Sequence, residues 1–307
     1  MILSVCPNPS IDCTVELEQL NVGRLNRVNN KIITCSGKAL NSAIGVRRLG
    51  GDSFATGFMY DENGSLFQQT LDNEGVKHTF VWNKGSVRMN YKIVYNKSML
   101  TEINDKGEVV EREKQKELLS LVANLSKKAS VVIISGSLPE GVSDDYYGEL
   151  VKSVDKNAKV IVDTSSQKLL SAISNGVYLV KPNLTELQDT VGKKLETIEE
   201  YLEGCNYLID KGAENVLLSL GRKGAILTNK NQAYFCKSAS VAVNSTVGAG
   251  DSMVAAVGVM TEKGVSYEEI LRSAVAAGTA SITTPGTNLF YRDKYEEIYS
   301  KIHTVKL

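Results

Sequence analysis

The sequence predicts an α/β protein: a mainly parallel β-sheet with helices on both faces, and a small antiparallel β-sheet beside it. From about residue 130 onward, short continuous apolar runs alternate with amphipathic stretches. Such runs are typical of strands that are covered on both faces. Residues 11–35 and 79–103 are rich in strand-forming residues with no helix between the strands, which favours antiparallel pairing. Polar residues also follow the ends of several predicted strands, as at a ligand-binding edge.

The parallel sheet is expected to begin with a strand over residues 2–6. Its later strands are the apolar runs SVVIIS, KVIVD, VYLVK and VLLSL, at residues 130–135, 159–163, 177–181 and 216–220. A helix over 38–49 is expected to end at Gly50 and Gly51, because glycine adopts the left-handed conformation that closes many helices. Further helices are expected over 144–154 and 166–174, joined to the strands by right-handed crossovers.

These elements divide the chain into a body and a lid. We expect residues 1–10, 36–78 and 104–307 to form the α/β body. We expect the regions 11–35 and 79–103 to form a β-strand lid over a cleft, where it would exclude water from a reaction. No low-complexity tract or linker separates the two parts.

Composition and charge exclude several classes of function. The 307 residues include 35 basic and 35 acidic side chains, and no long basic run, so nucleic-acid binding is not expected. No apolar stretch approaches the ~18 residues of a membrane span, and the opening MILSVCPNPS lacks the basic flank of a secretory signal. We therefore expect a cytoplasmic protein that binds neither nucleic acid nor membrane.

The small numbers of cysteine and histidine residues argue against several kinds of site. The five cysteines are scattered without a CxxC pair, which favours reduced thiols over a disulfide or zinc site. His78 and His303 are the only histidines in the sequence. A His-dependent zinc enzyme or a Ser-His-Asp hydrolase would need one of them in its site, and both are better explained as surface or structural residues.

A glycine loop followed by an apolar helix stands in SVAVNSTVGAGDSMVAAVGVM, residues 240–260. Gly248, Ala249 and Gly250 allow the backbone N–H groups at the helix start to approach an anion. Asp251 follows in the first turn, where it is either a helix-capping residue or a base that accepts a hydroxyl proton. The segment is not a Walker A loop, and Met253 stands where GxGxxG needs its last glycine.

Six segments in order resemble the PfkB carbohydrate kinases, which have the ribokinase-like fold. They are MILSVCPNPSID, SGKALN, SGSLPEGV, VKPNLTEL, VLLSLGRKGA and STVGAGDSMVAA, beginning at residues 1, 36, 135, 180, 216 and 245. The resemblance covers essentially the whole chain and is greatest to the branch of the 1-phosphofructokinases and tagatose-6-phosphate kinases. It implies an ATP-dependent, magnesium-assisted kinase.

The resemblance implies a role for individual residues. Asp251 is the catalytic base, and the N–H groups of Gly248, Ala249 and Gly250 form the anion hole. The residues implied for substrate binding are Asp12, Gly37, Lys38, Asn41 and Arg88, with Arg88 on the substrate phosphate, and with Ser137 and Arg27 as assistants. Arg27 is equally explained as a solvated lid charge. The residues implied for ATP and magnesium are Lys181, Asn183 and Glu186, the last two holding the ion through water, and the turn that contains Ser219, Gly221 and Gly224.

The acceptor implied first is fructose 1-phosphate, because STVGAGDS and TEIN at 101–104 are similar to the 1-phosphofructokinases. Tagatose 6-phosphate is the alternative. Ala39 stands where the family has glycine, which is either harmless in a helix or narrows the pocket, and it leaves open a catalytically weak regulatory homologue. A Rossmann dehydrogenase would fit the strands but lacks its glycine fingerprint. Exposed lid edges favour a homodimer through the lid.

Overall fold

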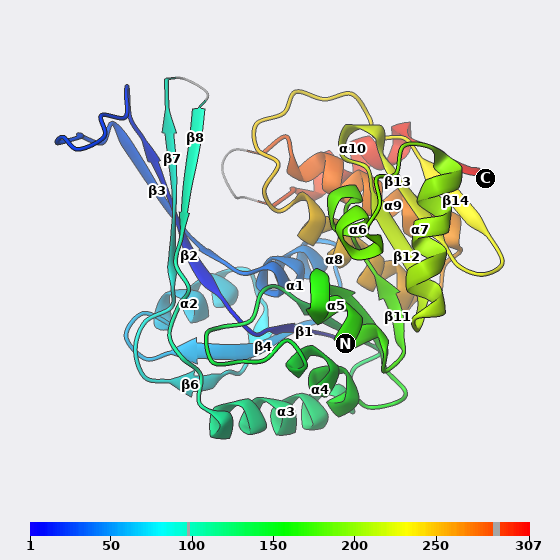
Figure 1. Cartoon of the computed structure of the whole chain (residues 1–307), viewed down its shortest axis with the longest axis horizontal. Coiled ribbons are helices and arrows are strands. Elements are labelled where there is room, and N and C mark those ends of the chain that lie inside the picture. Colours follow the sequence, from blue (N-terminus) through cyan, green and yellow to red (C-terminus); the bar gives the residue numbers. More distant parts are fainter. Residues whose placement is uncertain (97–98, 285–288) are drawn as a thin grey trace.

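The computed structural model describes residues 1–96, 99–284 and 289–307, and its largest element is a mostly parallel β-sheet (Figure 1). The strand order in this sheet is β15-β14-β13-β12-β11-β10-β9-β1-β4-β5, with β6 paired to β4. The strands are β1 (Ile2–Cys6), β4 (Ser53–Tyr60), β5 (Lys77–His78), β6 (Val81–Asn83), β9 (Val131–Ser135), β10 (Lys159–Asp163), β11 (Val177–Val180), β12 (Ala213–Ser219), β13 (Ala225–Thr228), β14 (Ala233–Cys236) and β15 (Thr304–Lys306).

The centre of this sheet is the core of the protein. Every residue of β1 and β9 is buried, as the continuous apolar runs predict for strands covered on both faces. β1 pairs in parallel with both β4 and β9, and β10, β11 and β12 continue the parallel order. The last strands, β13, β14 and β15, run antiparallel at one edge. The prediction of a mainly parallel sheet is therefore confirmed.

Helices cover both faces of the sheet. α1 and α8 pack on one face of the central strands, and α9 packs against α8 and over β13, β14 and β15, whereas α3, α4 and α5 lie on the other face (Figure 1). The helices are α1 (Lys38–Arg48), α2 (Ser65–Asn73), α3 (Arg112–Ser126), α4 (Tyr146–Ser153), α5 (Ser166–Ile173), α6 (Leu184–Val191), α7 (Ile198–Asp210), α8 (Ala249–Lys263), α9 (Tyr267–Ser281) and α10 (Arg292–Lys301), with a 3-10 turn η1 (Gly221–Lys223). Within the described ranges, no helix is both long and apolar enough to cross a membrane.

A second sheet of four strands rises from the body (Figure 1). Its order is β3-β2-β7-β8, where β2 is Ser10–Glu16, β3 is Asn30–Ser36, β7 is Met89–Tyr95 and β8 is Met99–Asn104. The outer pairs β2/β3 and β7/β8 are antiparallel, as predicted.

Two details of this small sheet differ from the sequence-based expectation. The central pair β2/β7 is parallel, because these strands come from distant parts of the chain and no hairpin constrains their direction. In addition, β6 pairs with β4 of the large sheet, although it falls within the 79–103 region expected in the lid. Alternation of side chains predicts a strand but does not reveal which neighbour it pairs with.

Candidate active site

A cavity of about 490 Å³ lies between the small sheet and the carboxyl ends of the parallel strands. Its size is that of a typical small-molecule site. The residues of the wall that the sequence singled out are Asp12, Gly37, Lys38, Asn41, Arg88, Ser137, Lys181, Asn183, Glu186, Ser219, Gly248, Gly250 and Asp251. They come from both sheets and from the N-termini of three helices, so the fold brings together positions that are far apart in the sequence.

The N-terminus of α8 forms one wall of the cavity. Gly248 precedes the helix with φ 80°, a left-handed conformation that favours glycine. Gly250 has a different role: a Cβ atom there would lie 3.2 Å from Nζ of Lys181, so glycine leaves space for that ammonium group. The first N–H groups of a helix have no partner within it. Together with the helix dipole and Lys181, they make this end of α8 suitable for a negatively charged group.

Asp251 lies in the first turn of α8 and is only 6% exposed. Its Oδ2 accepts a hydrogen bond from Nδ2 of Asn41 at 2.8 Å, and its backbone carbonyl accepts one from the Ser42 hydroxyl at 3.1 Å. Burial raises the pKa of Asp251 to about 6, against the opposing effect of the Lys38 charge. The Asp251 side chain does not cap its own helix. A buried carboxylate with a raised pKa on a cavity wall has the properties of a general base.

The N-terminus of α1 forms the neighbouring wall. Gly37 precedes the helix at φ 150°, and a Cβ atom there would lie 2.8 Å from the Cys6 sulfur, so a side chain does not fit. Ala39 is helical, fully buried and absent from the cavity wall. Two explanations of Ala39 were open: that it is harmless in the helix, or that it narrows the pocket. The structure supports the first, because the methyl group packs in the core and does not line the cavity.

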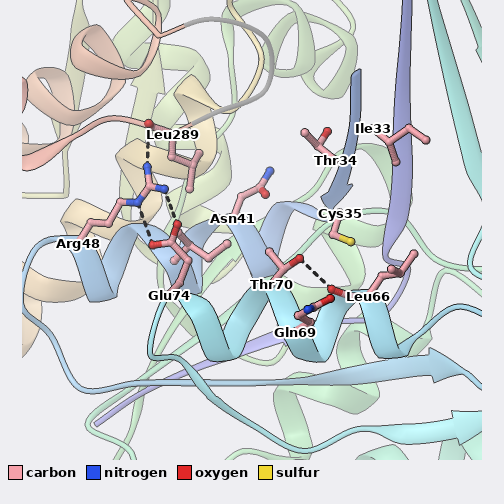
Figure 2. A pocket seen from close by; sticks show the side chains of 11 residues that line it. Ile33, Thr34, Cys35, Asn41, Arg48, Leu66, Gln69, Thr70, Glu74 and Leu289 are labelled. Atoms are coloured by element: carbon pink, nitrogen blue, oxygen red, sulfur yellow. Dashed lines mark hydrogen bonds and ion pairs between the residues drawn. The ribbon is translucent and has the colours of Figure 1, made fainter. Parts of the chain in front are cut away.

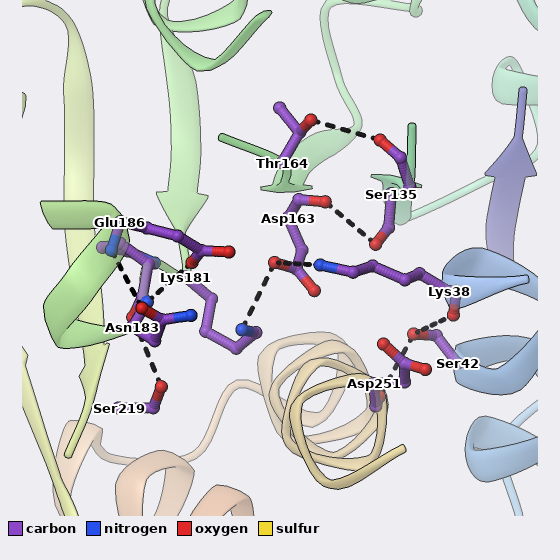
Figure 3. A network of polar contacts seen from close by, with 12 residues as sticks. Lys38, Ser42, Ser135, Asp163, Thr164, Lys181, Asn183, Glu186, Ser219 and Asp251 are labelled. Atoms are coloured by element: carbon purple, nitrogen blue, oxygen red, sulfur yellow. Dashed lines mark hydrogen bonds and ion pairs between the residues drawn. The ribbon is translucent and has the colours of Figure 1, made fainter. Parts of the chain in front are cut away.

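A buried ionic network joins the ends of three elements (Figure 3). Asp163, at the end of β10, is 1% exposed, and its Oδ1 lies 3.2 Å from Nζ of Lys181 and 3.6 Å from Nζ of Lys38. Burial alone would raise the pKa of Asp163, but Lys181 and Lys38 outweigh it and lower the pKa. Asp163 in turn raises the pKa of Lys38 to about 12, so Lys38 stays charged near neutral pH.

The small sheet contributes a polar cluster around Asp12. Asp12 Oδ1 accepts hydrogen bonds from Asn90 Nδ2 at 3.1 Å and from Ser10 Oγ at 3.3 Å. Lys92 Nζ donates to Asp12 Oδ2 at 3.0 Å. The carboxylate is buried and held on both oxygens, which fixes its orientation towards a ligand in the cavity.

Arg88 stands where the small sheet meets the body. Its Nη2 lies 3.4 Å from the Ser137 hydroxyl and 3.5 Å from the Asn8 carbonyl, and its Nη1 lies 3.5 Å from Asn90 Oδ1. These contacts are long for a guanidinium, and its buried Nε has no hydrogen-bond partner among the described residues. A phosphate group would satisfy these donors better than the protein does.

Asn183 and Glu186 form a reciprocal capping box at the start of α6. Asn183 Oδ1 accepts from the Glu186 N–H at 2.9 Å, and Glu186 Oε2 accepts from the Asn183 N–H at 2.8 Å. Both therefore have the ordinary capping role. Glu186 lines the cavity, and its second carboxylate oxygen, Oε1, lies outside the capping box; it is a hard donor of the kind magnesium prefers. One free oxygen fits an ion held through water, and the described residues contain no cluster of three or more acidic, histidine or cysteine side chains that could ligate a metal directly.

Four of the expected site residues are not on the cavity wall: Arg27, Ala249, Gly221 and Gly224. Arg27 is exposed at the far end of the lid. Gly221 begins η1 and Gly224 follows it, beyond Ser219, and a Cβ atom on Gly224 would lie 2.0 Å from the Cys236 carbonyl oxygen. Gly224 is therefore required by strand packing, whatever its part in binding a nucleotide.

A second cavity of about 330 Å³ lies between β3, α1 and α2 (Figure 2). Its charged side chains are already matched: Arg48 donates to both Glu74 oxygens, at 3.1 and 2.5 Å, and to the Leu289 carbonyl at 2.9 Å. Asn41 contributes to this wall as well as to the first cavity. Asn41 therefore lies between the two cavities, where it donates its hydrogen bond to Asp251.

Sequence reasoning assigned no role to several residues of the wall. They are Asn8, Ser10, Ser36, Asn90, Lys92, Glu102, Asn104, Gly136, Asp163 and Val247. Asn90 and Lys92 follow Arg88 at a spacing of two, which places them on the same face of β7. That spacing was the available signal. Asp163 was visible as a polar strand end, but its two lysine partners could be recognised only in three dimensions.

Comparison with known proteins shows which family the chain belongs to. The model of the pfkB family carbohydrate kinases matches residues 8–294. A 1-phosphofructokinase of Borreliella burgdorferi is 31% identical, over 92% of this chain and 91% of its own. A tagatose-6-phosphate kinase of Staphylococcus epidermidis is 30% identical, over the whole of both chains. The tetrameric inhibited form of phosphofructokinase-2 from Escherichia coli superposes with a TM-score of 0.89, with 27% identity over 98% of both chains.

Proposed function

Because this chain belongs to the PfkB family of carbohydrate kinases, we propose that it transfers a phosphoryl group from ATP to fructose 1-phosphate, giving fructose 1,6-bisphosphate. The observation that carries this proposal is the set of residues that line one cavity. A buried carboxylate, Asp251, lies beside an anion-binding helix end, and Arg88 lies on the same cavity wall with long contacts at its Nη atoms and no partner for its Nε among the described residues. One end suits the transferring group, and the other suits a phosphate already on the acceptor.

The proposed reaction needs little covalent chemistry from the protein. A sugar hydroxyl oxygen attacks the terminal phosphorus of ATP, its proton passes to Asp251, and ADP leaves with the electrons of the broken P–O bond. Asn41 holds the Asp251 carboxylate through the 2.8 Å hydrogen bond. The N–H groups at residues 248–250 and the Lys181 ammonium stabilise negative charge on the transferring oxygens.

ATP and magnesium would lie at the side of the cavity formed by Lys181, Asn183, Glu186 and Ser219. Asn183 and Glu186 would hold the magnesium ion through water, since only Glu186 Oε1 is free of the capping box. When bound, the ion neutralises charge on the ATP phosphates. Lys181 is 5% exposed and its Nζ is held 3.2 Å from Asp163 Oδ1, so its ammonium group has a fixed place on the same side.

Fructose 1-phosphate is proposed over other acceptors on two grounds. Relatives named 1-phosphofructokinase match nearly the whole chain, at 31% and 29% identity. The TEIN segment that resembles those enzymes forms part of β8, and its Glu102 and Asn104 line the cavity. These side chains lie close to the Asp12 cluster, where sugar hydroxyls would bind.

A coupled assay of ADP release tests the acceptor, with fructose 1-phosphate, fructose 6-phosphate, tagatose 6-phosphate and unphosphorylated sugars as substrates. We expect kcat/KM to be highest for fructose 1-phosphate, by about tenfold or more, because a misplaced phosphate loses at least one charge-assisted hydrogen bond of about 1.5–3 kcal/mol. A preference for tagatose 6-phosphate would overturn the assignment of the acceptor. Equal use of unphosphorylated sugars would overturn the role of Arg88, and no ATP-dependent turnover would favour a regulatory binding protein.

We also propose that the protein forms a homodimer through the outer face of the lid. One transverse row of the small sheet, Thr34–Asp12–Asn90–Asn104, is polar and lies on the cavity side. The next row, Ile33–Cys13–Tyr91–Ile103, points to the opposite face, and Ile33, Tyr91 and Ile103 are 51%, 41% and 55% exposed. An uncharged apolar row at this exposure is typical of a covered face. A second copy is the proposed partner, consistent with the tetrameric form named for the Escherichia coli relative.

Light scattering coupled to size-exclusion chromatography tests this interface. We expect the wild type to elute as a dimer, and Ile33→Glu with Ile103→Glu to elute as a monomer, because two carboxylates would have to be desolvated at the interface. Val305→Glu is a matched control, since Val305 is 54% exposed in β15 of the large sheet. A monomeric wild type, or a dimer that both lid substitutions leave intact, would contradict the proposal.

A further inference from the structure

Asp163 is a buried carboxylate to which the reaction described above assigns no task. It is 1% exposed, and neither of its oxygens accepts a regular hydrogen bond from the described residues. Its contacts are the two ammonium groups of Lys181 and Lys38, at 3.2 and 3.6 Å from the same oxygen, Oδ1. Burying an ion pair is not in itself stabilising, because the cost of desolvation offsets the attraction between the charges. A need for stability therefore gives no sufficient reason for this arrangement.

The position of the two lysines suggests another reason. Lys181 Nζ lies beside Gly250, close enough that a Cβ atom there would come within 3.2 Å. Lys38 begins α1, the helix that packs on α8, and its charge acts on Asp251. Asp163 thus stands between two cations that flank the anion-binding end of α8 (Figure 3). Without a carboxylate between them, the two ammonium groups would repel each other and the positive end of the helix.

We propose that Asp163 is a positioning residue that holds the ammonium groups of Lys38 and Lys181 on the two sides of the transferring phosphoryl group. This inference rests on the proposed kinase function. Lys181 would contact the group on the side of its donor, and Lys38 on the side of the acceptor hydroxyl. The four side chains, Lys38, Lys181, Asp163 and Asp251, carry no net charge before reaction. When Asp251 takes the proton, the cluster gains one positive charge at the moment when negative charge moves onto the acceptor side.

The test is a double-mutant cycle between Asp163→Asn and Lys181→Met, with kcat and both KM values measured at saturating magnesium. We expect each single variant to lower kcat by about 100-fold, as for the loss of one stabilising group in the transition state. We expect KM for the sugar phosphate to change less than about threefold, because Arg88 and Asp12 remain. The double variant should lose about tenfold less than the product of the single losses but still more than Lys181→Met alone, because the carboxylate acts through both lysines.

A second readout is the pH profile of kcat. Asp163 raises the pKa of Asp251 and the lysines lower it. Asp163→Asn should therefore move the acid limb of the profile to lower pH, which a merely structural residue would not do. Asp144→Asn is the matched control, since Asp144 makes an ion pair with Lys168 at the same 3.6 Å but is 50% exposed. Its kcat and pH profile should equal those of the wild type.

Several results would overturn the proposal. Losses that multiply in the double variant would show that Asp163 acts independently of Lys181. Activity of Asp163→Asn restored by excess magnesium would show that Asp163 acts on the metal. If Asp163→Asn does not fold, Asp163→Leu with Lys181→Met removes the more deeply buried ion pair as a whole and leaves only the 44% exposed Lys38 without its partner. That pair should turn over more slowly than Lys181→Met alone, because Lys38 loses its partner, and equal rates would contradict the proposal. Absence of wild-type turnover would instead refute the kinase function itself.

Discussion

Asp251→Asn is expected to lower kcat by about 10³-fold, within the range found for the loss of a general base, with little change in KM for either substrate. The carboxamide has the same shape and keeps an oxygen to accept the hydrogen bond that Asn41 donates at 2.8 Å. What it loses is the ability to accept the hydroxyl proton. Steady-state kinetics of the purified variant would measure this loss.

The same residue predicts the pH dependence of the wild type. Burial raises the pKa of Asp251 to about 6, and the base must be deprotonated to act. We therefore expect kcat to fall about tenfold per pH unit below pH ~6 and to level off above it. In Asp251→Asn this acid limb should disappear, because the group that titrates is gone.

Stability should change in the opposite direction to activity. The pKa of Asp251 rises from 3.8 to about 6 on folding, so the folded state binds the proton more tightly and loses stability as pH rises through this interval. The rise corresponds to ~3 kcal/mol. Asp251→Asn lacks this cost, and its free energy of unfolding at pH 8 should exceed that of the wild type.

Asp293→Asn is the matched control, since Asp293 also lies in the first turn of a helix, α10, but at an exposed position. Its kinetics and stability should match those of the wild type. Undiminished turnover in Asp251→Asn would show that Asp251 is only an acidic residue at a helix terminus, and it would refute the proposed mechanism.

Arg88→Ala is expected to raise KM for the phosphorylated sugar by about 100-fold, because each hydrogen bond to a charged group contributes about 1.5–3 kcal/mol. The contacts that Arg88 makes within the protein are 3.4–3.5 Å long, so little protein structure depends on them. The loss should therefore appear in substrate binding more than in folding. Initial rates over a range of sugar-phosphate concentrations would measure it.

The pattern across substrates distinguishes a phosphate contact from general damage. KM for ATP should stay within about threefold of the wild type, since a distant contact is unaffected. Arg88→Lys should recover part of the affinity, because lysine keeps the charge but not the paired donors. Arg47→Ala is the control, as Arg47 also makes one 3.4 Å contact to a carbonyl, but outside the cavity. An unchanged KM in Arg88→Ala would show that the phosphate binds elsewhere, and Lys92 on the same cavity wall would be the next residue to test.

The body of the fold was largely predictable from the sequence, and the reason is burial. The strand predicted over 159–163 is β10 with the same bounds, and the helix predicted over 38–49 is α1, one residue shorter. Both elements are buried so completely that their apolar pattern leaves no alternative. The glycine loop could be predicted equally well, because a glycine before an apolar helix is a local signal for a helix start. Gly248 does precede α8 in the left-handed conformation.

The parts that escaped prediction depend on which strands become neighbours. The ion pairs of Asp163 require β10 and β11 to end beside the start of α1. Residue spacing along the chain does not predict that these ends become neighbours. The bonds of Asp12 to Asn90 and Lys92 require the parallel register of β2 on β7. Propensity describes a strand, whereas pairing is decided by the whole fold.

The parallel pairing of β2 with β7 also determines when the lid can form during folding. Asp12 and Asn90, which pair across it, are 78 residues apart, whereas the hairpins β2/β3 and β7/β8 are local. Closing so long a loop costs entropy that local pairing avoids. Until β1 and β4 have joined and the chain has passed residue 95, the edge of β2 is open to other chains. We therefore expect the four-stranded sheet to form after its two hairpins, and the β2 edge to be the part of the lid most open to wrong pairing until then.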